Sequence, residues 1–444
     1  MLTDKPFKYA DYLSILDEED GEELFEPLIE ILTQIELITS DAKDQGAIVG
    51  IKGDWGVGKT SVLKAIEEYF KNCYSCPTVF FEAWKYQDED SPVLPLLAQL
   101  RQVSKGTTKR KLSRFMGIFV KRFFYFGSDI ASRMLTGHFL GEAVGLKELK
   151  KDIKDTLEVA GKTQIENYSR FDELFQNLED VVQDIIKEFS YKGEVKEGWR
   201  KLQKKVRERK GKSDIKALFI LIDDLDRLLP DKAIKLLEAI RFYYALPNTV
   251  IVMGINDKIL IDILEEHYRI GKKPYFSGQK FMEKLFHLSI ELPHYRFNPV
   301  IHKIHFRDVI KSLNEEDIPE DSKRLLYSLD PLPHRKWLRI ANKWEQFIIN
   351  NNDNNIAPSY SEALFRAIVE ECFPKAELFM RNFPMLWEDF SGFYNNPAPE
   401  LQEIKDKVAN IIKNDNTFFE FPTGNFTRLL HEWEKIKETE RDNI

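Results

Sequence analysis

Residues 53–61 contain the feature that most constrains the fold of this chain, a glycine-rich loop between two regular elements. The segment Gly53-Asp-Trp-Gly-Val-Gly-Lys-Thr60 matches the pattern GxxxxGK[ST] without a gap. The short apolar run 47–51 before it predicts a buried strand, and the apolar residues of 62–70 recur at helical spacing. A strand, a loop and a helix in this order predict the opening of a parallel α/β sheet with right-handed crossovers.

The residue types of this loop suit a nucleoside triphosphate better than they suit a glycine-rich turn without a ligand. Glycines let backbone N–H groups turn toward phosphate oxygens, because a Cβ atom would block that approach. The helix that begins near Lys59 adds the positive end of its dipole. We expect Lys59 to reach the β- and γ-phosphates of ATP and Thr60 to ligate Mg²⁺. The predicted nucleotide-binding residues are Gly53, Asp54, Trp55, Gly56, Val57, Gly58, Lys59, Thr60 and Ser61.

Apolar runs at 79–81 and 217–222 predict two further buried strands, and the later one ends in the acidic segment Asp223-Asp-Leu-Asp-Arg227. Parallel strands deliver their carboxyl ends to the edge of the sheet where a nucleotide binds. We expect Asp223 to hold Mg²⁺, and Asp224 to orient or deprotonate the attacking water. For Asp226 and Arg227 two interpretations stay open: a local ion pair, or an arginine that reaches the site of a neighbouring subunit.

The next predicted strand, 249–254, ends at Asn256 and Asp257. A polar side chain at this point can sense the γ-phosphate, and Asn256 is our candidate for that role. The competing interpretation is a helix cap, with Asn256 or Asp257 capping the helix that begins at Lys258.

The overall composition predicts a cytoplasmic protein. The net charge of −8 argues against nonspecific coating of nucleic acid through the overall field. No apolar run reaches 18 residues, so we expect no ordinary transmembrane helix, with peripheral attachment to the inner face of the membrane as the alternative. The pair Cys73 and Cys76 has redox-motif spacing, but a lone CxxC is a weak signal and reduced thiols are the expectation.

We predict an α/β fold with a parallel-sheet P-loop NTPase core, a large helical insertion and a C-terminal all-helical region. We predict four divisions: an N-terminal helical segment at 1–45, a nucleotide-binding core at 46–295, a helical lid at 296–349 and a C-terminal helical interaction region at 350–444. The helical insertion lies inside the core, at about 100–212. The polar stretch Asn350–Asn355 predicts a loop or linker.

Three further blocks accompany the loop over about residues 45–295. They are Phe81-Glu-Ala-Trp-Lys-Tyr86, Ile222-Asp-Asp-Leu-Asp-Arg227 and Lys280-Phe-Met-Glu-Lys-Leu-Phe286, the last followed by Leu292-Pro293. In this combination the chain resembles the KAP family of P-loop NTPases, which belongs to the same larger group as the AAA+ and STAND ATPases.

The resemblance carries expectations beyond the loop. It implies a five-stranded parallel core with the acidic strand beside the P-loop strand, and a C-terminal helical lid. Pro333-His-Arg335 resembles the proline–arginine motif of that lid, so Arg335 is a candidate for contact with the γ-phosphate; a solvated helix face is the alternative. Lys284 is expected either to reach the phosphate of a neighbouring subunit or to pair with an acid such as Glu283.

The insertion departs from the membrane-spanning segment of many family members. Its apolar runs are split by Lys121-Arg122, so it cannot cross a bilayer as one helix. Basic and aromatic residues occur together over 105–133, which suits a buried or partner-facing helical hairpin, an anionic membrane surface or a nucleic-acid backbone.

These observations predict an ATPase with ATP and Mg²⁺ as its ligands, acting as a nucleotide-controlled switch or assembly factor. The expected partners are further copies of the chain and a separate effector protein, and the family resemblance implies bacterial defence against phage or other foreign DNA as a setting. One alternative is a remodelling ATPase whose insertion binds DNA or a membrane. Another is a scaffold that binds nucleotide without hydrolysing it.

Overall fold

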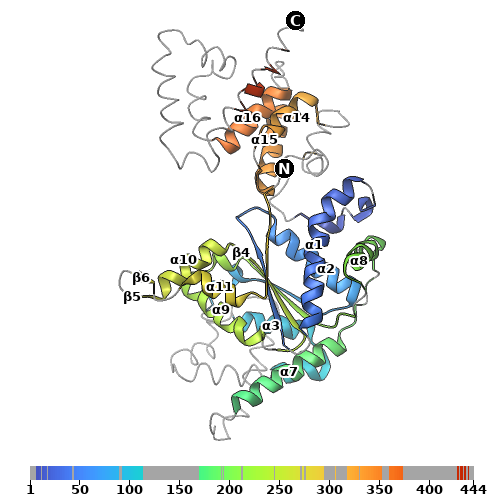
Figure 1. Cartoon of the computed structure of the whole chain (residues 1–444), viewed down its shortest axis with the longest axis vertical. Helices are drawn as coiled ribbons and strands as arrows, with labels where there is room; N and C mark the ends of the chain where they lie inside the picture. Colours follow the sequence, from blue (N-terminus) through green and yellow to red (C-terminus); the bar gives the residue numbers. More distant parts are fainter. Residues whose placement is uncertain are drawn as a thin grey trace. The chain divides into compact units, whose positions relative to one another are not determined.

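The centre of the larger unit is a parallel sheet of short, buried apolar strands (Figure 1). The computed structural model describes residues 7–113, 170–294, 306, 318–373 and parts of 428–439, with short gaps inside these ranges. Five strands lie in the order β2-β3-β4-β1-β7, and every pair is parallel. They are β1 (Ala47–Lys52), β2 (Thr78–Glu82), β3 (Leu218–Asp223), β4 (Thr249–Ile255) and β7 (Leu288–Glu291).

The acidic strand β3 does not lie beside the P-loop strand β1, so that expectation was wrong. Strand β4 separates them, because Ile251 lies opposite Ile48 on one side and opposite Ile220 on the other. All seven residues of β4 are buried. A strand that is buried throughout, with Thr249 as its single polar residue, suits the centre of a sheet covered on both faces. The expected number of strands and their parallel direction are confirmed.

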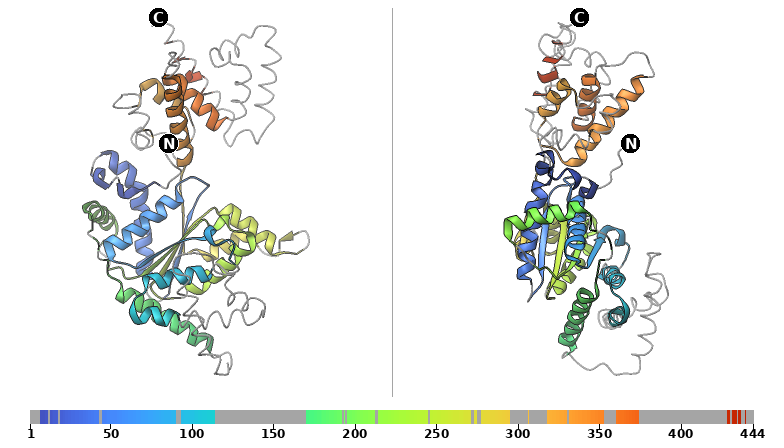
Figure 2. Two further views of the ribbon diagram at one scale, coloured as in Figure 1. Left: turned by 180° about the vertical axis from the view of Figure 1, so that it is seen from behind. Right: turned by 90° about the vertical axis from the view of Figure 1, so that its right-hand side faces the viewer.

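Helices cover both faces of this sheet (Figure 2). Helices α1 and α2 contact the strands on one face, and α8 packs on both of these helices. Helices α3, α7, α9, α10 and α11 contribute to the apolar cluster on the other face. Their bounds are α1 (Glu19–Asp41), α2 (Lys59–Tyr74), α3 (Val93–Val103), α7 (Arg170–Glu188), α8 (Glu197–Lys210), α9 (Pro230–Tyr244), α10 (Asp257–His267) and α11 (Gly278–Leu285). Short 3-10 turns and a small hairpin are also present in this unit. The turns are η1 (Tyr9–Asp11), η2 (Leu13–Ile15), η3 (Ala83–Tyr86) and η4 (Leu225–Arg227), and the hairpin strands are β5 (Arg269–Ile270) and β6 (Lys273–Pro274).

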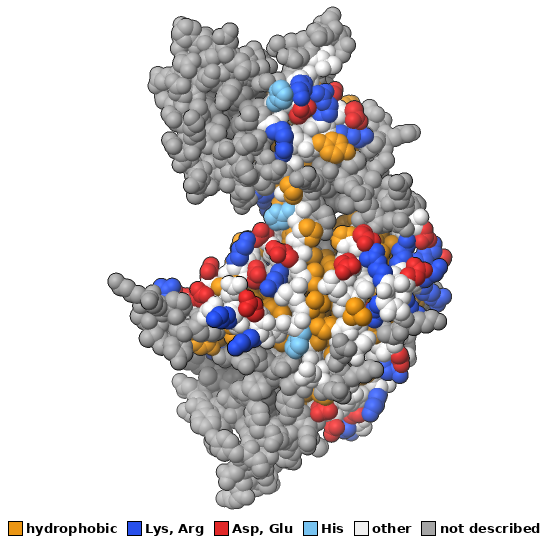
Figure 3. Space-filling view, in the orientation of Figure 1, with side chains coloured by type: hydrophobic (Ala, Val, Ile, Leu, Met, Phe, Trp, Pro, Cys, Tyr) orange, Lys and Arg blue, Asp and Glu red, His pale blue; other side chains and the backbone are white. Residues whose placement is uncertain are grey.

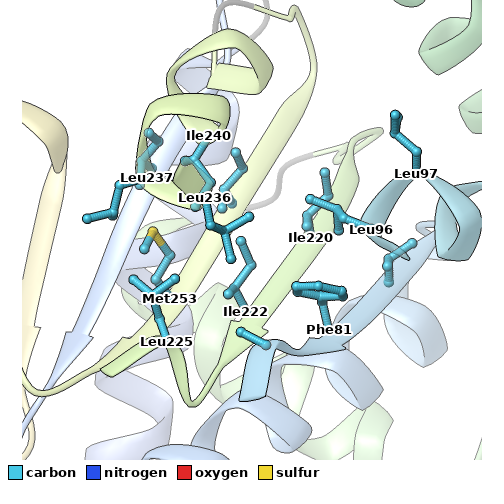
Figure 4. Close-up of a cluster of buried hydrophobic side chains, with 14 of the residues drawn as sticks. Phe81, Leu96, Leu97, Ile220, Ile222, Leu225, Leu236, Leu237, Ile240 and Met253 are labelled. Atoms are coloured by element: carbon cyan, nitrogen blue, oxygen red, sulfur yellow. The ribbon is translucent and has the colours of Figure 1, made fainter. Parts of the chain in front are cut away.

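Alternate residues of each strand point to opposite faces and build two cores. Figure 4 shows one of them, where Phe81, Ile220, Ile222 and Met253 of the strands meet side chains of α3 and α9. On the other face the rings of Phe70 and Phe219 stack with centroids 4.0 Å apart. This contact fixes α2, the helix that follows the glycine-rich loop, against β3, the strand that carries the acids.

A buried ion pair joins the N-terminal helix to the last helix of the insertion. Lys210 Nζ of α8 lies 2.8 Å from Glu36 Oε2 of α1, and both side chains are at most 3% exposed. Two tyrosines of α2 donate to the same carboxylate: Tyr69 at 2.5 Å and Tyr74 at 2.8 Å from Oε1. Three helices therefore meet at one carboxylate, which satisfies the hydrogen-bonding needs of a buried charge.

At the surface, charges of both signs mix over α1 and α8 (Figure 3). Arg209 pairs with Glu26 at 2.6 Å and with Glu30 at 3.5 Å, and Lys201 pairs with Asp17 at 2.7 Å. Acidic residues of the N-terminal segment thus neutralise much of the basic charge of α8. Exposed pairs of this kind contribute little stability individually, so the buried pair matters more.

The described helices of the predicted insertion include residues 106–113, α7 and α8, and short non-helical segments lie between them. Helix α7 carries an apolar stripe, whose Leu178, Val181, Val182 and Ile185 are buried. Residues 114–169, which include most of the basic and aromatic stretch, lie outside the described residues. Among the residues that are described, no helix is both long enough and apolar enough to cross a membrane.

The second unit comprises residues 293–444 with the loop residues 54–58 and the first five residues of the chain. Its described helices are α14 (Glu320–Tyr327), α15 (His334–Asn352) and α16 (Tyr360–Cys372). They enclose a core that includes Trp337, Trp344 and Phe365. Helix α15 extends to Asn352, so the loop predicted at Asn350–Asn355 was wrong for its first three residues, and residues 353–355 lie outside the described residues. Packing of the apolar stripe of α15 carries the helix into a segment whose composition favours a loop.

We expect the Glu36–Lys210 pair to show strong coupling in a double-mutant cycle. Lys210→Met leaves an uncompensated buried carboxylate and should lower the free energy of unfolding by about 3–5 kcal/mol. Adding Glu36→Gln removes that charge while keeping an acceptor for both tyrosines, so the double variant should be more stable than Lys210→Met alone. Denaturant unfolding of the four proteins measures the coupling, and simply additive losses would contradict it.

Candidate nucleotide-binding site

The glycine-rich loop begins where β1 ends and is shaped by its glycines. Gly56 and Gly58 have φ angles of +82° and +111°, which side-chain-bearing residues rarely adopt. The Gly53 N–H donates to the Ile255 carbonyl at 3.2 Å, so the start of the loop is fixed to the end of β4. The loop backbone thus adopts conformations that favour glycine, and α2 starts directly after it.

Lys59 is the first residue of α2 and its side chain folds back over the loop. Its Nζ donates to the Gly53 carbonyl at 2.8 Å, and the residue is only 9% exposed. The ammonium group is thereby held close to the backbone that would cradle the phosphates. Ser61 is also buried, one residue after Thr60.

Asp223 lies at the carboxyl end of β3, where the Thr60 hydroxyl donates a hydrogen bond to its side chain. Burial raises the pKa of Asp223 from 3.8 to about 6; the neighbouring Asp224 charge adds to this, whereas the Thr60 bond and Lys59 oppose it. A Cβ atom at Gly254 of β4 would lie 3.1 Å from Asp223 Oδ1 and 2.8 Å from Leu63 Cδ1. Gly254 therefore leaves the space that the buried carboxylate occupies.

Asp224 adopts the left-handed conformation, with φ +56° and ψ +33°. This backbone costs roughly 1–2 kcal/mol for most residues, although aspartate tolerates it better than others. The side chain pairs with Arg227, whose Nε lies 2.9 Å from Oδ1. Burial raises the pKa of Asp224, Arg227 lowers it, and the charge of Asp226 raises it. Arg227 thus forms a local ion pair, with Asp224 as a partner that the sequence did not suggest.

Asn256 directly follows β4 and is 8% exposed. It is the N-cap residue of α10, but its side chain makes no capping hydrogen bond. The amide is therefore not committed to the competing role of a helix cap. The adjacent Asp257 pairs instead with Lys52 at the end of β1, at 3.5 Å. The sensor role of Asn256 stays a prediction.

Arg335 belongs to the unit that also includes residues 54–58. Within that unit its backbone N–H donates to the Gly56 carbonyl at 3.1 Å, and a Cβ atom at Gly56 would lie 2.7 Å from Arg335 Cβ. The loop residue Asp54 lies 3.5 Å from His294 Nε2. Lys284 is exposed near the end of α11. Roles for the Arg335 guanidinium and for Lys284 at a phosphate stay predictions.

The residues present fit magnesium and a triphosphate. The Thr60 hydroxyl and the Asp223 carboxylate are oxygen donors in direct contact, and Mg²⁺ prefers oxygen ligands. The charge of the ion would offset the cost of burying the Asp223 carboxylate and its repulsion with Asp224, which together raise the Asp223 pKa. Thr60 and Asp223 would hold the ion, and the loop N–H groups with Lys59 would hold the phosphates.

The cysteine pair is unrelated to this site. The Cys73 thiol donates to the Trp199 carbonyl at 3.4 Å, and the Cys76 thiol donates to the Ile215 carbonyl at 3.6 Å. Burial raises the pKa of both thiols to about 12. Thiols with such a raised pKa are poor nucleophiles at neutral pH.

Two of these features were not predicted from the sequence. Gly254 reads as an ordinary strand residue until β3 and β4 are known to be neighbours. The partner of Arg227 depends on the left-handed turn at Asp224, for which the only sequence signal is that aspartate tolerates this conformation.

Comparison with known proteins gives one strong result. The model of the KAP family P-loop domain matches residues 25–357, which include the loop, the acidic strand end and the whole of α15. No curated protein matches the sequence. Among solved structures, the Aeropyrum pernix ORC2 protein, determined in ADPNP–ADP complexes, is similar over 91% of this chain and 84% of its own, with 11% identity and a TM-score of 0.33.

We expect Asp223→Asn to stabilise the protein in the absence of Mg²⁺ and nucleotide. The raised pKa means that the ionised carboxylate disfavours the folded state at pH 7.5, by an amount on the order of 1–3 kcal/mol. Asparagine removes that charge and keeps an acceptor for Thr60. Thermal unfolding in a chelator should show a higher Tm for this variant, with the exposed Asp262→Asn as the control. A lower Tm would show that the charge is already compensated.

Proposed function

Because this chain belongs to the KAP family of P-loop NTPases, we propose that it binds ATP with Mg²⁺ and hydrolyses it as a nucleotide-controlled switch. One observation carries the proposal: the hydrogen bond from Thr60 to Asp223. It brings the loop and the acidic strand together through the two oxygen groups that suit magnesium. Asp224 follows Asp223 directly, and an acceptor for the proton of the attacking water is needed for hydrolysis but not for a scaffold that only binds ATP.

Each residue of the site has a part in this proposal. The loop N–H groups and Lys59 bind the phosphates, and Mg²⁺, when bound, neutralises phosphate charge as the terminal bond breaks. Asp224 accepts a hydrogen bond from the attacking water and takes up its proton. Asn256 orients that water or contacts the γ-phosphate from the end of β4. Arg335 is the candidate for contact with the γ-phosphate.

The switch part of the proposal rests on the conformational preference that a bound nucleotide would impose. A ligand that binds one conformation of the chain more tightly than another shifts the population toward that conformation. Hydrolysis then removes that preference, so assembly with further copies or an effector protein follows the state of the nucleotide.

Turnover by the purified protein tests the proposal directly. Lys59→Ala should abolish ATP binding and hydrolysis together, because it removes the charge that holds the phosphates. Asp224→Asn should keep ATP binding and lower kcat by about a hundredfold or more, because it removes the proton acceptor. Lys64→Ala is the matched control: Lys64 lies on the same helix, and its ammonium group faces the Phe80 ring at 5.6 Å.

Other outcomes of this experiment separate the competing functions. Turnover that survives in both site variants would rule out this site as the source. Binding without turnover under every condition would favour the scaffold. Stimulation by DNA or by anionic vesicles would favour the remodelling ATPase, with the insertion as the contact surface. A role in defence against foreign DNA predicts that a bacterial host expressing the protein resists phage and that Lys59→Ala abolishes the resistance.

A further inference from the structure

The backbone of Asp224 needs an explanation beyond its predicted chemistry. It is one of three non-glycine residues with positive φ among those the structure describes, the others being Ser75 and Asn248. A non-glycine residue in this region persists only when its surroundings hold it there. At a predicted proton acceptor, such a conformation sets the direction in which the carboxylate points.

Arg227 holds Asp224 at both its backbone and its side chain. Its N–H donates to the Asp224 carbonyl at 3.2 Å, which closes the turn, and its Nε pairs with Oδ1 at 2.9 Å. The intervening turn is a 3-10 helix, in which residues three apart lie on the same side. Leu225 and Leu228 fix this turn, because both are buried in the core below the sheet end.

Arg227 is the cation nearest to Asp224 in sequence. The other charged groups that act on Asp224 have partners of their own. Glu82 at the end of β2 contributes a repulsive charge to Asp224, but it pairs with Lys85. Lys59 also attracts Asp224, although its ammonium group is bonded to the loop at Gly53. Arg227 is 43% exposed and Asp224 is 16% exposed, so the pair lies at the boundary between core and solvent.

We propose that Arg227 is a positioning residue that acts on Asp224 of its own chain. By occupying Oδ1 it fixes the carboxylate with Oδ2 directed away from the pair and available to the attacking water. This inference rests on the proposed function, because it assigns Arg227 to the same ATP hydrolysis. It differs from an arginine that reaches into a neighbouring subunit, since a side chain holding its own Asp224 cannot serve a second site at the same time.

Steady-state kinetics distinguish positioning from a merely structural role. Arg227→Ala should lower kcat about tenfold to a hundredfold, as expected when a catalytic group is misplaced, with the KM for ATP changed less than twofold. Arg227→Lys should recover part of kcat, because lysine restores the charge without the planar guanidinium. Arg269→Ala is the matched control: it removes another i,i+3 pair, with Glu266, outside the site, and Arg269 is about as exposed as Arg227.

Mixing two variants tests whether Arg227 acts within one chain. Arg227→Ala retains Asp224, and Asp224→Asn retains Arg227. If the pair must lie in one chain, a mixture of the two variants hydrolyses ATP no faster than their average. If Arg227 serves a neighbouring subunit, the mixture regains activity, and the proposal is overturned. Full kcat in Arg227→Ala would overturn it as well.

Two readouts separate failure of this inference from failure of the proposed function. If the wild-type protein hydrolyses no ATP, the proposed function fails, and the pair is then judged by thermal unfolding of Arg227→Ala, Asp224→Ala and the double variant. Non-additive Tm shifts support the pairing, and additive shifts contradict it. Binding of a non-hydrolysable ATP analogue should be the same in Arg227→Ala as in the wild type, which also shows that the variant is folded.

Discussion

The register of three parallel strands determines where the residues of the candidate site lie. Lys52, the last residue of β1, is opposite Ile255, and Ile222 of β3 is opposite Met253. The three strands therefore end almost level with one another. The glycine-rich loop, the two adjacent acids and Asn256 each follow one of these ends, so local sequence places them at one edge of the sheet. Stacking of Phe70 on Phe219 then holds α2 against β3 and keeps Thr60 beside Asp223.

This edge of the sheet combines features that a fold selected for stability alone would avoid. Asp223 is buried beside a second acid, Asp224 has a left-handed backbone, and Lys59 is buried at the start of a helix. Such local conflicts are expected where function requires them, because the rest of the fold compensates for their cost. Here the compensation comes from Thr60, Lys59, Arg227 and the space left by Gly254. The buried Glu36–Lys210 pair provides a second polar centre, at the other end of the helix that carries Lys59 and Thr60.

Much of this could be predicted from the sequence, because the strongest signals are local. The four strands β1 to β4 are apolar runs with β-branched residues, and the loop and acids follow them directly. Strand order is not local: that β4 separates β1 from β3 depends on which apolar surfaces pair, and nothing within either strand reveals it. Strand β7 was not predicted, because it has four residues and none of them is buried. The turn at Asp224 and its pairing with Arg227 depend on packing of Leu225 and Leu228, which a reading of residue types does not capture.

The contact between Thr60 and Asp223 is the centre of this interpretation, and the Mg²⁺ dependence of nucleotide affinity tests it most directly. Calorimetric titration of a non-hydrolysable ATP analogue should show tighter binding by the wild-type protein with Mg²⁺ than in a chelator. Thr60→Ala and Asp223→Asn should both lose that increment while keeping the affinity measured without the ion. An unchanged Mg²⁺ dependence in the two variants would contradict a magnesium site at this edge of the sheet.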